Sequence, residues 1–321
     1  MSAAIIFALG SGALSAVFYA SALTAARGGM IFMFLVQLPL FLVGLSREQG
    51  WRGAALAGGA GTLAIALTAG AWGAGNYAIA EAVPAIVLVR QASLSRSQAD
   101  GRIEWYPAGR LLVWLSLYAA AVLLAFMLYY MNTEGGLEGE LQRGMVAFFQ
   151  SIEVSLPPEA ERLLDALVGI MPGLGGASWL LITAGNAVLA QALLQRFGHN
   201  LRPGVELASL SLPWWLALAV AVTAAVGLLA SDGMSFAARN LCFVLTVPYF
   251  FGGLACLHLL ARRRGAGPRM MGLLYMALAI AIVCLTWLAV MAIAALGLID
   301  QVAGLRRRLA RPHDRSDGSW E

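Results

Sequence analysis

The chain has 321 residues, of which 60% are hydrophobic and only 12% are charged, and its mean hydropathy is +0.77. Soluble domains carry roughly 25% charged residues, so this composition excludes an ordinary soluble protein. All 21 basic residues are arginine, and we attribute the net charge of +4 to the loops of a membrane protein rather than to nucleic-acid binding.

Nine apolar runs follow one another along the chain, most of them long enough to cross a hydrocarbon core of ~30 Å. We therefore predict an all-α, polytopic membrane protein with eight or nine transmembrane helices. The second and fourth runs are short, and each contains a proline, Pro39 or Pro84, that tends to kink a helix. The runs are Ala3–Thr24, Met30–Leu45, Gly53–Trp72, Asn76–Val89, Arg110–Tyr130, Ala177–Leu194, Leu212–Ala230, Phe236–Leu260 and Met271–Leu298.

Arginines concentrate in alternate loops, with twelve after the even-numbered runs and four in the other loops. Because basic residues are retained on the cytoplasmic side, we expect these loops and the N-terminus to lie inside a bacterial inner membrane. Nine spans would put the arginine-rich tail, residues 306–321, outside. We therefore leave open a doubled or re-entrant last run, or one miscounted run. We expect residues 1–305 to form a single membrane domain and the tail to be disordered.

The one long polar interval, residues 131–172, has a net charge of −5. Hydrophobic residues recur in it at helical spacing, and Pro157-Pro158 marks the start of a second such segment. We predict two amphipathic helices in one outer loop. They would either cap the outer ends of the spans or form a lid over an external pocket.

Small residues occupy every fourth position of the first run, at Ala8, Gly12, Ala16 and Ala20. Such a stripe lets two helix backbones approach closely in a membrane. It would pack against another helix of this chain, or dock a partner protein or a second copy.

Polar residues inside the apolar runs are few, and a lone carboxylate, Glu81, is the least expected of them. An ionisable group in hydrocarbon costs at least a few kcal/mol, and it usually faces a partner or a cavity. Glu81 is therefore a ligand or proton site, or half of a structural pair with Arg239, unless its span is misplaced. We predict that the candidate polar site consists of Glu81, Asn186, Arg239 and Asn240 around one cavity; Gln37, Thr183 and Gln191 are the other polar residues in these runs.

Familiar catalytic and cofactor patterns are absent from the sequence. Three scattered histidines and three cysteines within apolar runs give no triad, metal-ligand spacing or HExxH, and no GxxxxGK[ST] phosphate loop occurs. We therefore expect neither an enzyme nor an ATPase, with no catalytic, cofactor or metal site.

A loop before the fifth run carries Glu104, Trp105, Tyr106, Pro107 and Arg110, which we interpret as an interfacial belt followed by a helix start. With the short Leu38-Pro39-Leu40 run, it resembles the uncharacterised YybS-like membrane proteins in their alphaproteobacterial form, known as domain of unknown function 2232. The resemblance covers nearly the whole chain. That family is distantly similar to the substrate-binding subunits of energy-coupling-factor transporters, which bind a small molecule in the membrane and dock a motor through small residues of the first helix. No substrate carries over.

These observations favour a membrane-embedded component that binds or transports a small molecule. The alternative is a non-catalytic scaffold or assembly partner. We expect contact with membrane lipid and with another membrane protein or a second copy, no nucleic acid, and a small-molecule ligand that the sequence does not identify.

Overall fold

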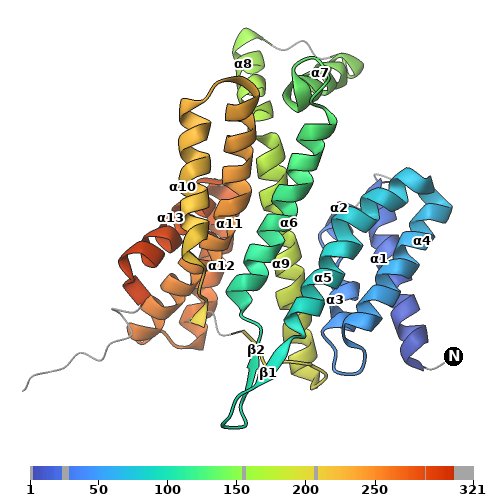
Figure 1. Ribbon diagram of the computed structural model, residues 1–321, viewed down its shortest axis with the longest axis vertical. Helices are drawn as coiled ribbons and strands as arrows, with labels where there is room; N and C mark the ends of the chain where they lie inside the picture. Colours follow the sequence, from blue (N-terminus) through green and yellow to red (C-terminus); the bar gives the residue numbers. More distant parts are fainter. Residues whose placement is uncertain (1–2, 24–28, 154–156, 206–208, 286, 307–321) are drawn as a thin grey trace, which may run out of the picture.

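The computed structural model describes residues 3–23, 29–153, 157–205, 209–285 and 287–306, and the predicted tail lies outside them except for Arg306. The protein is an all-α bundle, as predicted, and the described residues also form a short β-hairpin, which was not predicted (Figure 1). Its N-terminal half contains α1 Ala3–Leu23, α2 Gly29–Met33, α3 Leu38–Gly44, α4 Gly50–Tyr77, the π-helix η1 Ala78–Ala82, α5 Val83–Ala92, β1 Ser95–Ser97, β2 Ile103–Trp105 and α6 Ala108–Tyr129. Its C-terminal half contains α7 Gly136–Ser151, α8 Pro158–Val168, α9 Met171–Phe197, α10 Trp214–Leu229, α11 Asp232–Arg263, α12 Pro268–Leu285 and α13 Trp287–Ala303.

Five of the described helical stretches are long and apolar enough to cross a membrane. One of them, the 43-residue stretch Gly50–Ala92, reverses direction at Gly70, where φ is 74° and ψ is −177°. Glycine adopts a positive φ without steric cost. Beyond this reversal Tyr77 returns to Gly61, and Ile86 returns to Gly58. The third and fourth predicted runs are therefore two antiparallel limbs, each close to the length that spans ~30 Å.

The second predicted run is broken. Helix α2 ends at Met33, turns occupy residues 34–37, and α3 begins just before Pro39. The fourth run is also irregular, because the π-helix η1 directly precedes Pro84 in α5. Both irregularities occur at the two runs in which a proline predicted a kink.

The small-residue stripe of α1 packs against α4 of the same chain. Ala8 is fully buried, and a Cβ added to Gly12 would collide with the backbone carbonyl of Ala57. The close approach of these two backbones is the packing that small residues permit. The partner of the stripe is thus a helix of this chain.

The last predicted run is two helices rather than one span. Helices α12 and α13 contact each other, and α13 packs closely along α11, with Gly253 against Ile293. The run for which a doubled or re-entrant pass, or a miscount, was left open is therefore a pair of shorter apolar helices. Its closing segment is held by Arg306, whose side chain donates hydrogen bonds to the buried Asp300 carboxylate and to the Leu210 carbonyl oxygen.

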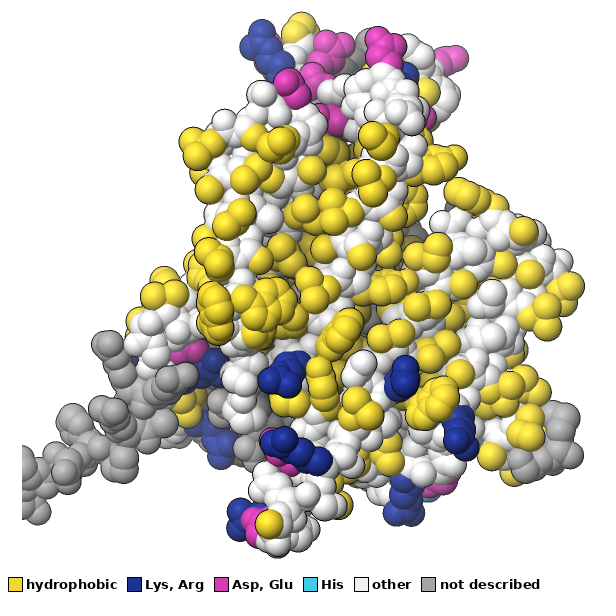
Figure 2. Space-filling view, viewed as in Figure 1, with side chains coloured by type: hydrophobic (Ala, Val, Ile, Leu, Met, Phe, Trp, Pro, Cys, Tyr) yellow, Lys and Arg dark blue, Asp and Glu magenta, His cyan; other side chains and the backbone are white. Residues whose placement is uncertain are grey.

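The two ends of the molecule carry side chains of opposite charge. Figure 2 shows acidic side chains gathered at the end formed by α7 and α8, and most of the visible arginines at the opposite end, around the β-hairpin. At the arginine-rich end the loop after α3 meets the loop after α9 through the bridge Ser46–Asn200, and Gln49 donates a hydrogen bond to the carbonyl oxygen of Ala4. The N-terminal helix start and these loops therefore share one end, as the arginine bias predicted.

Candidate functional site

Two backbone carbonyls in the helix around Glu81 lack their usual helical hydrogen-bond donors. Pro84 has no N–H, so it cannot donate to the carbonyl oxygen of Ala80 four residues earlier. In the π-helix the N–H of Val83 donates instead to Ala78, which leaves the carbonyl oxygen of Ile79 without its usual helical partner. A chain segment in hydrocarbon must satisfy such groups from within the protein.

Three side chains from other elements satisfy these carbonyls. Gln37 Nε2 and Trp179 Nε1 donate to the Ala80 oxygen at 3.1 and 2.9 Å, and the Tyr118 hydroxyl donates to the Ile79 oxygen at 2.7 Å. These donors come from the turn before α3, from α9 and from α6. The break at Pro84 is therefore the point at which three parts of the bundle are joined.

Glu81 itself is partly buried on this break. The side chain of Gln37 lies beside its carboxyl group, and Tyr19 and Tyr77 are close enough to interact with it electrostatically. Tyr77 is held in turn by Ser15, whose Oγ lies 2.7 Å from the Tyr77 hydroxyl oxygen and donates to the carbonyl oxygen of Val36. Glu81 thus belongs to a polar cluster within the N-terminal half.

The four residues of the predicted polar site do not form one cluster. Asn186 on α9 donates to the carbonyl oxygen of Phe34 at 2.7 Å, so it reaches the same broken segment as Glu81 does through Gln37. Asn240 is fully buried elsewhere, and it donates to the carbonyl oxygen of Gly169 and accepts from the N–H of Gly173.

Arg239 lies on the exposed side of α11, with its side chain against Gly227 of α10. Its contact with α10 replaces the ion pair with Glu81 that we considered. The two α11 residues therefore join α11 to its neighbours and do not line a site with Glu81.

A cavity of about 250 Å³ lies at the arginine-rich end, between α3, α5, α6 and α9. Its walls are almost entirely apolar, and they include Phe41, Leu88, Leu112 and Ala187, together with Phe251 of α11. The polar side chains at this cavity are Gln191, Gln195 and Arg202. A largely apolar cavity with a few convergent polar groups is the usual form of a small-molecule site.

Arg202 is the charged residue of the cavity, and it is only 9% exposed. Its Nη1 donates long hydrogen bonds of 3.3 Å to the carbonyl oxygens of Ala92 and Tyr106, and its guanidinium lies 5.9 Å from the centre of the Trp105 ring. Its buried Nε has no hydrogen-bond partner among the described residues. Burial lowers the pKa of Arg202, but an arginine remains charged at physiological pH.

The loop that carries the family resemblance contacts Arg202 through the Tyr106 carbonyl oxygen and the Trp105 ring. Glu104 in β2 accepts hydrogen bonds from Arg96 at 2.6 Å and Gln98 at 3.0 Å, and the bond from Arg96 lowers the pKa of Glu104. The Tyr106 hydroxyl accepts a hydrogen bond from Trp114 Nε1. Pro107 precedes α6, and Arg110 in its first turn is exposed.

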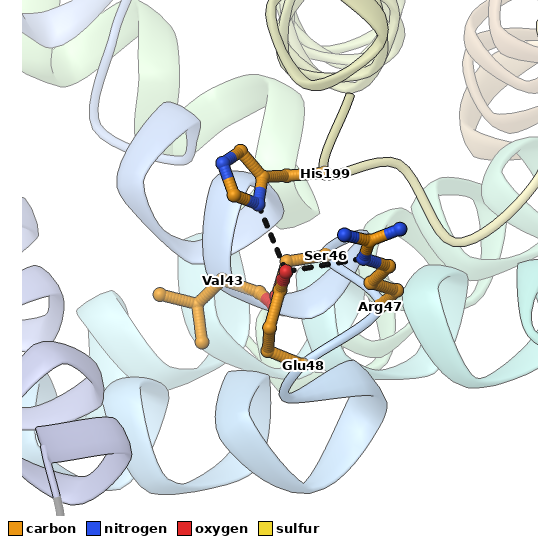
Figure 3. Close-up of polar contacts among 5 residues, drawn as sticks. All are labelled: Val43, Ser46, Arg47, Glu48 and His199. Atoms are coloured by element: carbon orange, nitrogen blue, oxygen red, sulfur yellow. Dashed lines mark hydrogen bonds and ion pairs between the residues drawn. The ribbon is translucent and has the colours of Figure 1, made fainter. Parts of the chain in front are cut away.

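The two loops beside the cavity are braced against each other (Figure 3). Nδ1 of His199, after α9, lies 2.8 Å from Oε1 of Glu48, which Arg47 also approaches at 3.3 Å. Backbone bonds run alongside, from the N–H of Arg47 to the carbonyl oxygen of His199 and from the N–H of Leu201 to that of Leu45. The hydrogen bond with His199 is the main reason that the pKa of Glu48 is lowered.

Sequence reasoning treated Arg202 only as one of twelve loop arginines. Its neighbours at Ala92 and Tyr106 lie 110 and 96 residues away in the sequence, so no local pattern indicates that it is buried. Gln191 stands out in the sequence as an intramembrane polar residue, and it donates to the backbone of Arg202 at 2.7 Å. Within the described part of the chain, no cluster of three or more His, Cys, Asp or Glu side chains could hold a metal ion.

The model of a family described as "Predicted membrane protein (DUF2232)" matches residues 13–301. No curated protein matches the chain, and no solved structure does.

Proposed function

The chain belongs to the family of predicted membrane proteins DUF2232, and we propose that it binds a small molecule within the membrane, as a binding or transport component without an ATPase of its own. It is an integral, multi-pass membrane protein. The observation that supports the proposal is the apolar cavity of about 250 Å³ that Arg202 and Gln191 line, each of which carries a buried side-chain atom without a hydrogen-bond partner among the described residues.

The position of the cavity also favours binding. Its walls include α3 and α5, the helices that continue the two proline-broken runs. Broken helices commonly build the substrate sites of transporters, because their irregular backbone presents polar groups at membrane depth. The cytoplasmic placement of the arginine-rich end in a bacterial inner membrane is part of this proposal, on the strength of the arginine bias.

Substrate-binding subunits of energy-coupling-factor transporters bind a small molecule in the membrane and dock a motor. Our proposal takes only the binding from this likeness. Docking of a motor through the first helix has less support, because Ala8 and Gly12 are already buried against α4. The scaffold alternative is weakened for the same reason, because the small-residue stripe of α1 already packs against α4. A lid formed by α7 and α8 would not cover this cavity, because those helices lie at the opposite end (Figure 1).

The proposal is tested by the small molecules that accompany the protein through purification in a mild detergent. Protein would be denatured and its released compounds measured by mass spectrometry, for the unaltered chain and for Ala187→Phe, which fills the cavity. Gly185→Phe is the matched control, because it adds the same ring on α9 where a side chain meets open space.

A compound present near one equivalent in the unaltered protein and in Gly185→Phe, and depleted in Ala187→Phe, is the expected result. Equal amounts in all three proteins, or no compound in any of them together with no binding of added amphiphiles, would refute the proposal. Thermal unfolding in the same detergent checks that both variants remain folded.

A further inference from the structure

We infer that the cavity binds an amphiphile with one hydrocarbon chain and one anionic head, a carboxylate or a phosphate monoester, and that the head pairs with Arg202. This inference rests on the proposed function and names the class of ligand for the same cavity. It follows from the unsatisfied charge at one end of the cavity and from the apolar walls of the rest.

The charge of Arg202 is incompletely compensated. A buried cation is costly unless it is paired and hydrogen-bonded. Among the described residues no carboxylate lies within 4 Å of Arg202, and its two long bonds to the carbonyls of Ala92 and Tyr106 leave Nε without an acceptor. The Trp105 ring supplies a cation–π contact, but it accepts no N–H bond in the plane of the guanidinium.

An anionic oxygen supplies what is missing at this position. The guanidinium fork matches carboxylate and phosphate oxygens, and bonds between ionised partners are roughly twice as strong as neutral ones. Gln191 lies beside it, 9% exposed, with its Oε1 buried and unpartnered in the described structure. A protonated or hydroxylated head group could donate to that oxygen while its charged oxygen meets Arg202.

The remainder of the cavity requires a hydrocarbon. Phe41, Leu88, Leu112 and Ala187 offer no hydrogen bonds, so a sugar or a second charge would be left unpaired there. At about 30 Å³ for each water-sized group, a volume of about 250 Å³ accommodates roughly eight such groups. This is room for one medium-length chain and not for two.

The cavity is also accessible to such a ligand. Val188 lines it and is 61% exposed on α9, and Val205 lines it and is 42% exposed. A chain can therefore enter from the surface beside α9 while its head moves toward the buried Arg202. A free amphiphile and phosphatidic acid, a bilayer phospholipid with a phosphate-monoester head that inserts one chain, share this chemistry.

The test compares amphiphiles of equal chain length that differ in the head. Purified protein in a neutral detergent would be titrated with decanoate, decyl phosphate, decanol and decylamine, and binding followed by native mass spectrometry and by Trp fluorescence. Decanoate and decyl phosphate should bind at least tenfold more tightly than decanol or decylamine. Equal affinity for decanoate and decanol would overturn the assignment of the head without requiring any variant.

Variants then localise the head. Arg202→Gln should weaken decanoate binding at least tenfold. Arg202→Lys keeps the charge but loses the guanidinium fork, so its affinity for decanoate should lie between those of the unaltered protein and Arg202→Gln. Arg90→Gln is the control, because it removes the same charge from an exposed position at the end of α5. Unchanged decanoate binding in Arg202→Gln would refute the inference.

Two outcomes separate this inference from the proposed function. If decanol binds as well as decanoate and Ala187→Phe abolishes both, the cavity binds small molecules and only the anionic head is refuted. If no amphiphile binds and nothing co-purifies, the proposed function fails as well. In nanodiscs, loss of decanoate binding with phosphatidic acid, whose head is a phosphate monoester, but not with phosphatidylcholine assigns the anion to a bilayer lipid, whereas binding in both assigns it to a free amphiphile.

Discussion

The carbonyl oxygen of Ala80 provides a quantitative test of how the broken helix is held. It accepts from both Gln37 Nε2 and Trp179 Nε1, so either donor can be removed while the other remains. Gln37→Leu and Trp179→Phe should each cost about 0.6–2 kcal/mol, the range for interhelical hydrogen bonds in membranes. In both single variants the carbonyl keeps one partner.

The double variant should cost more than the sum of the two. It leaves the Ala80 oxygen without a donor in an apolar segment, and an orphaned buried acceptor costs about 1–3 kcal/mol. We therefore expect a coupling free energy of at least about 1 kcal/mol in the double-mutant cycle. Lost packing of the Trp179 ring and the lost contact of Gln37 with Glu81 occur in both backgrounds, so they cancel in the cycle.

The assay is reversible unfolding in mixed micelles, with the free energy of unfolding measured for all four proteins. Pro84→Ala supplies the backbone N–H that is missing at position 84, and adding it to the double variant should reduce the coupling toward zero. If the losses in unfolding free energy of the two single variants add up to that of the double variant within about 0.5 kcal/mol, the view that these side chains replace the missing helical bond is refuted. Failure of Pro84→Ala to rescue the double variant would refute it as well.

Two further predictions concern packing and pH. Gly12→Ala should destabilise the protein by about 1–3 kcal/mol because the new Cβ meets the Ala57 carbonyl, whereas Gly10→Ala, in open space on the same helix, should cost nothing; equal unfolding free energies in micelles would contradict this. The pKa of Glu48 lies below its ordinary 4.5, so its pairing with His199 should stabilise the protein above that pH and lose this effect as the pH falls through the lowered value. Both side chains are about half exposed, so solvent screening limits the effect to about 1 kcal/mol or less, and the unfolding free energies of Glu48→Gln and the unaltered protein should converge in acid.

Composition and periodicity predicted the features that depend on local sequence. The apolar runs, the breaks near Pro39 and Pro84, the two amphipathic helices and the common end of the arginine-rich loops are all present. Each follows from a property of a short segment, namely its hydropathy, its missing N–H or its charge. The boundary between the third and fourth runs was predicted at residues 73–75, whereas the chain reverses at Gly70, inside the third run.

Features that depend on which segments meet could not be predicted. The stripe of α1 could have met any helix with small residues, and Asn240 could have faced Glu81 or, as it does, Gly169 and Gly173. Apolar spans of similar length do not specify their neighbours, because lipid solvates their surfaces as well as another helix does. The partners are selected by shape and by a few buried hydrogen bonds, which only the assembled bundle defines.

The polar cluster around Glu81 and the cavity around Arg202 are joined by α5. This helix begins at the carbonyls that Gln37, Trp179 and Tyr118 hold, and its last turn supplies Leu88 to the cavity wall and Ala92 as an acceptor for Arg202. Movement of α5 would therefore change both ends together. Because the break concentrates side-chain hydrogen bonds at the start of α5, the contacts of Gln37, Trp179 and Tyr118 also fix where the last turn of α5 lies at the cavity.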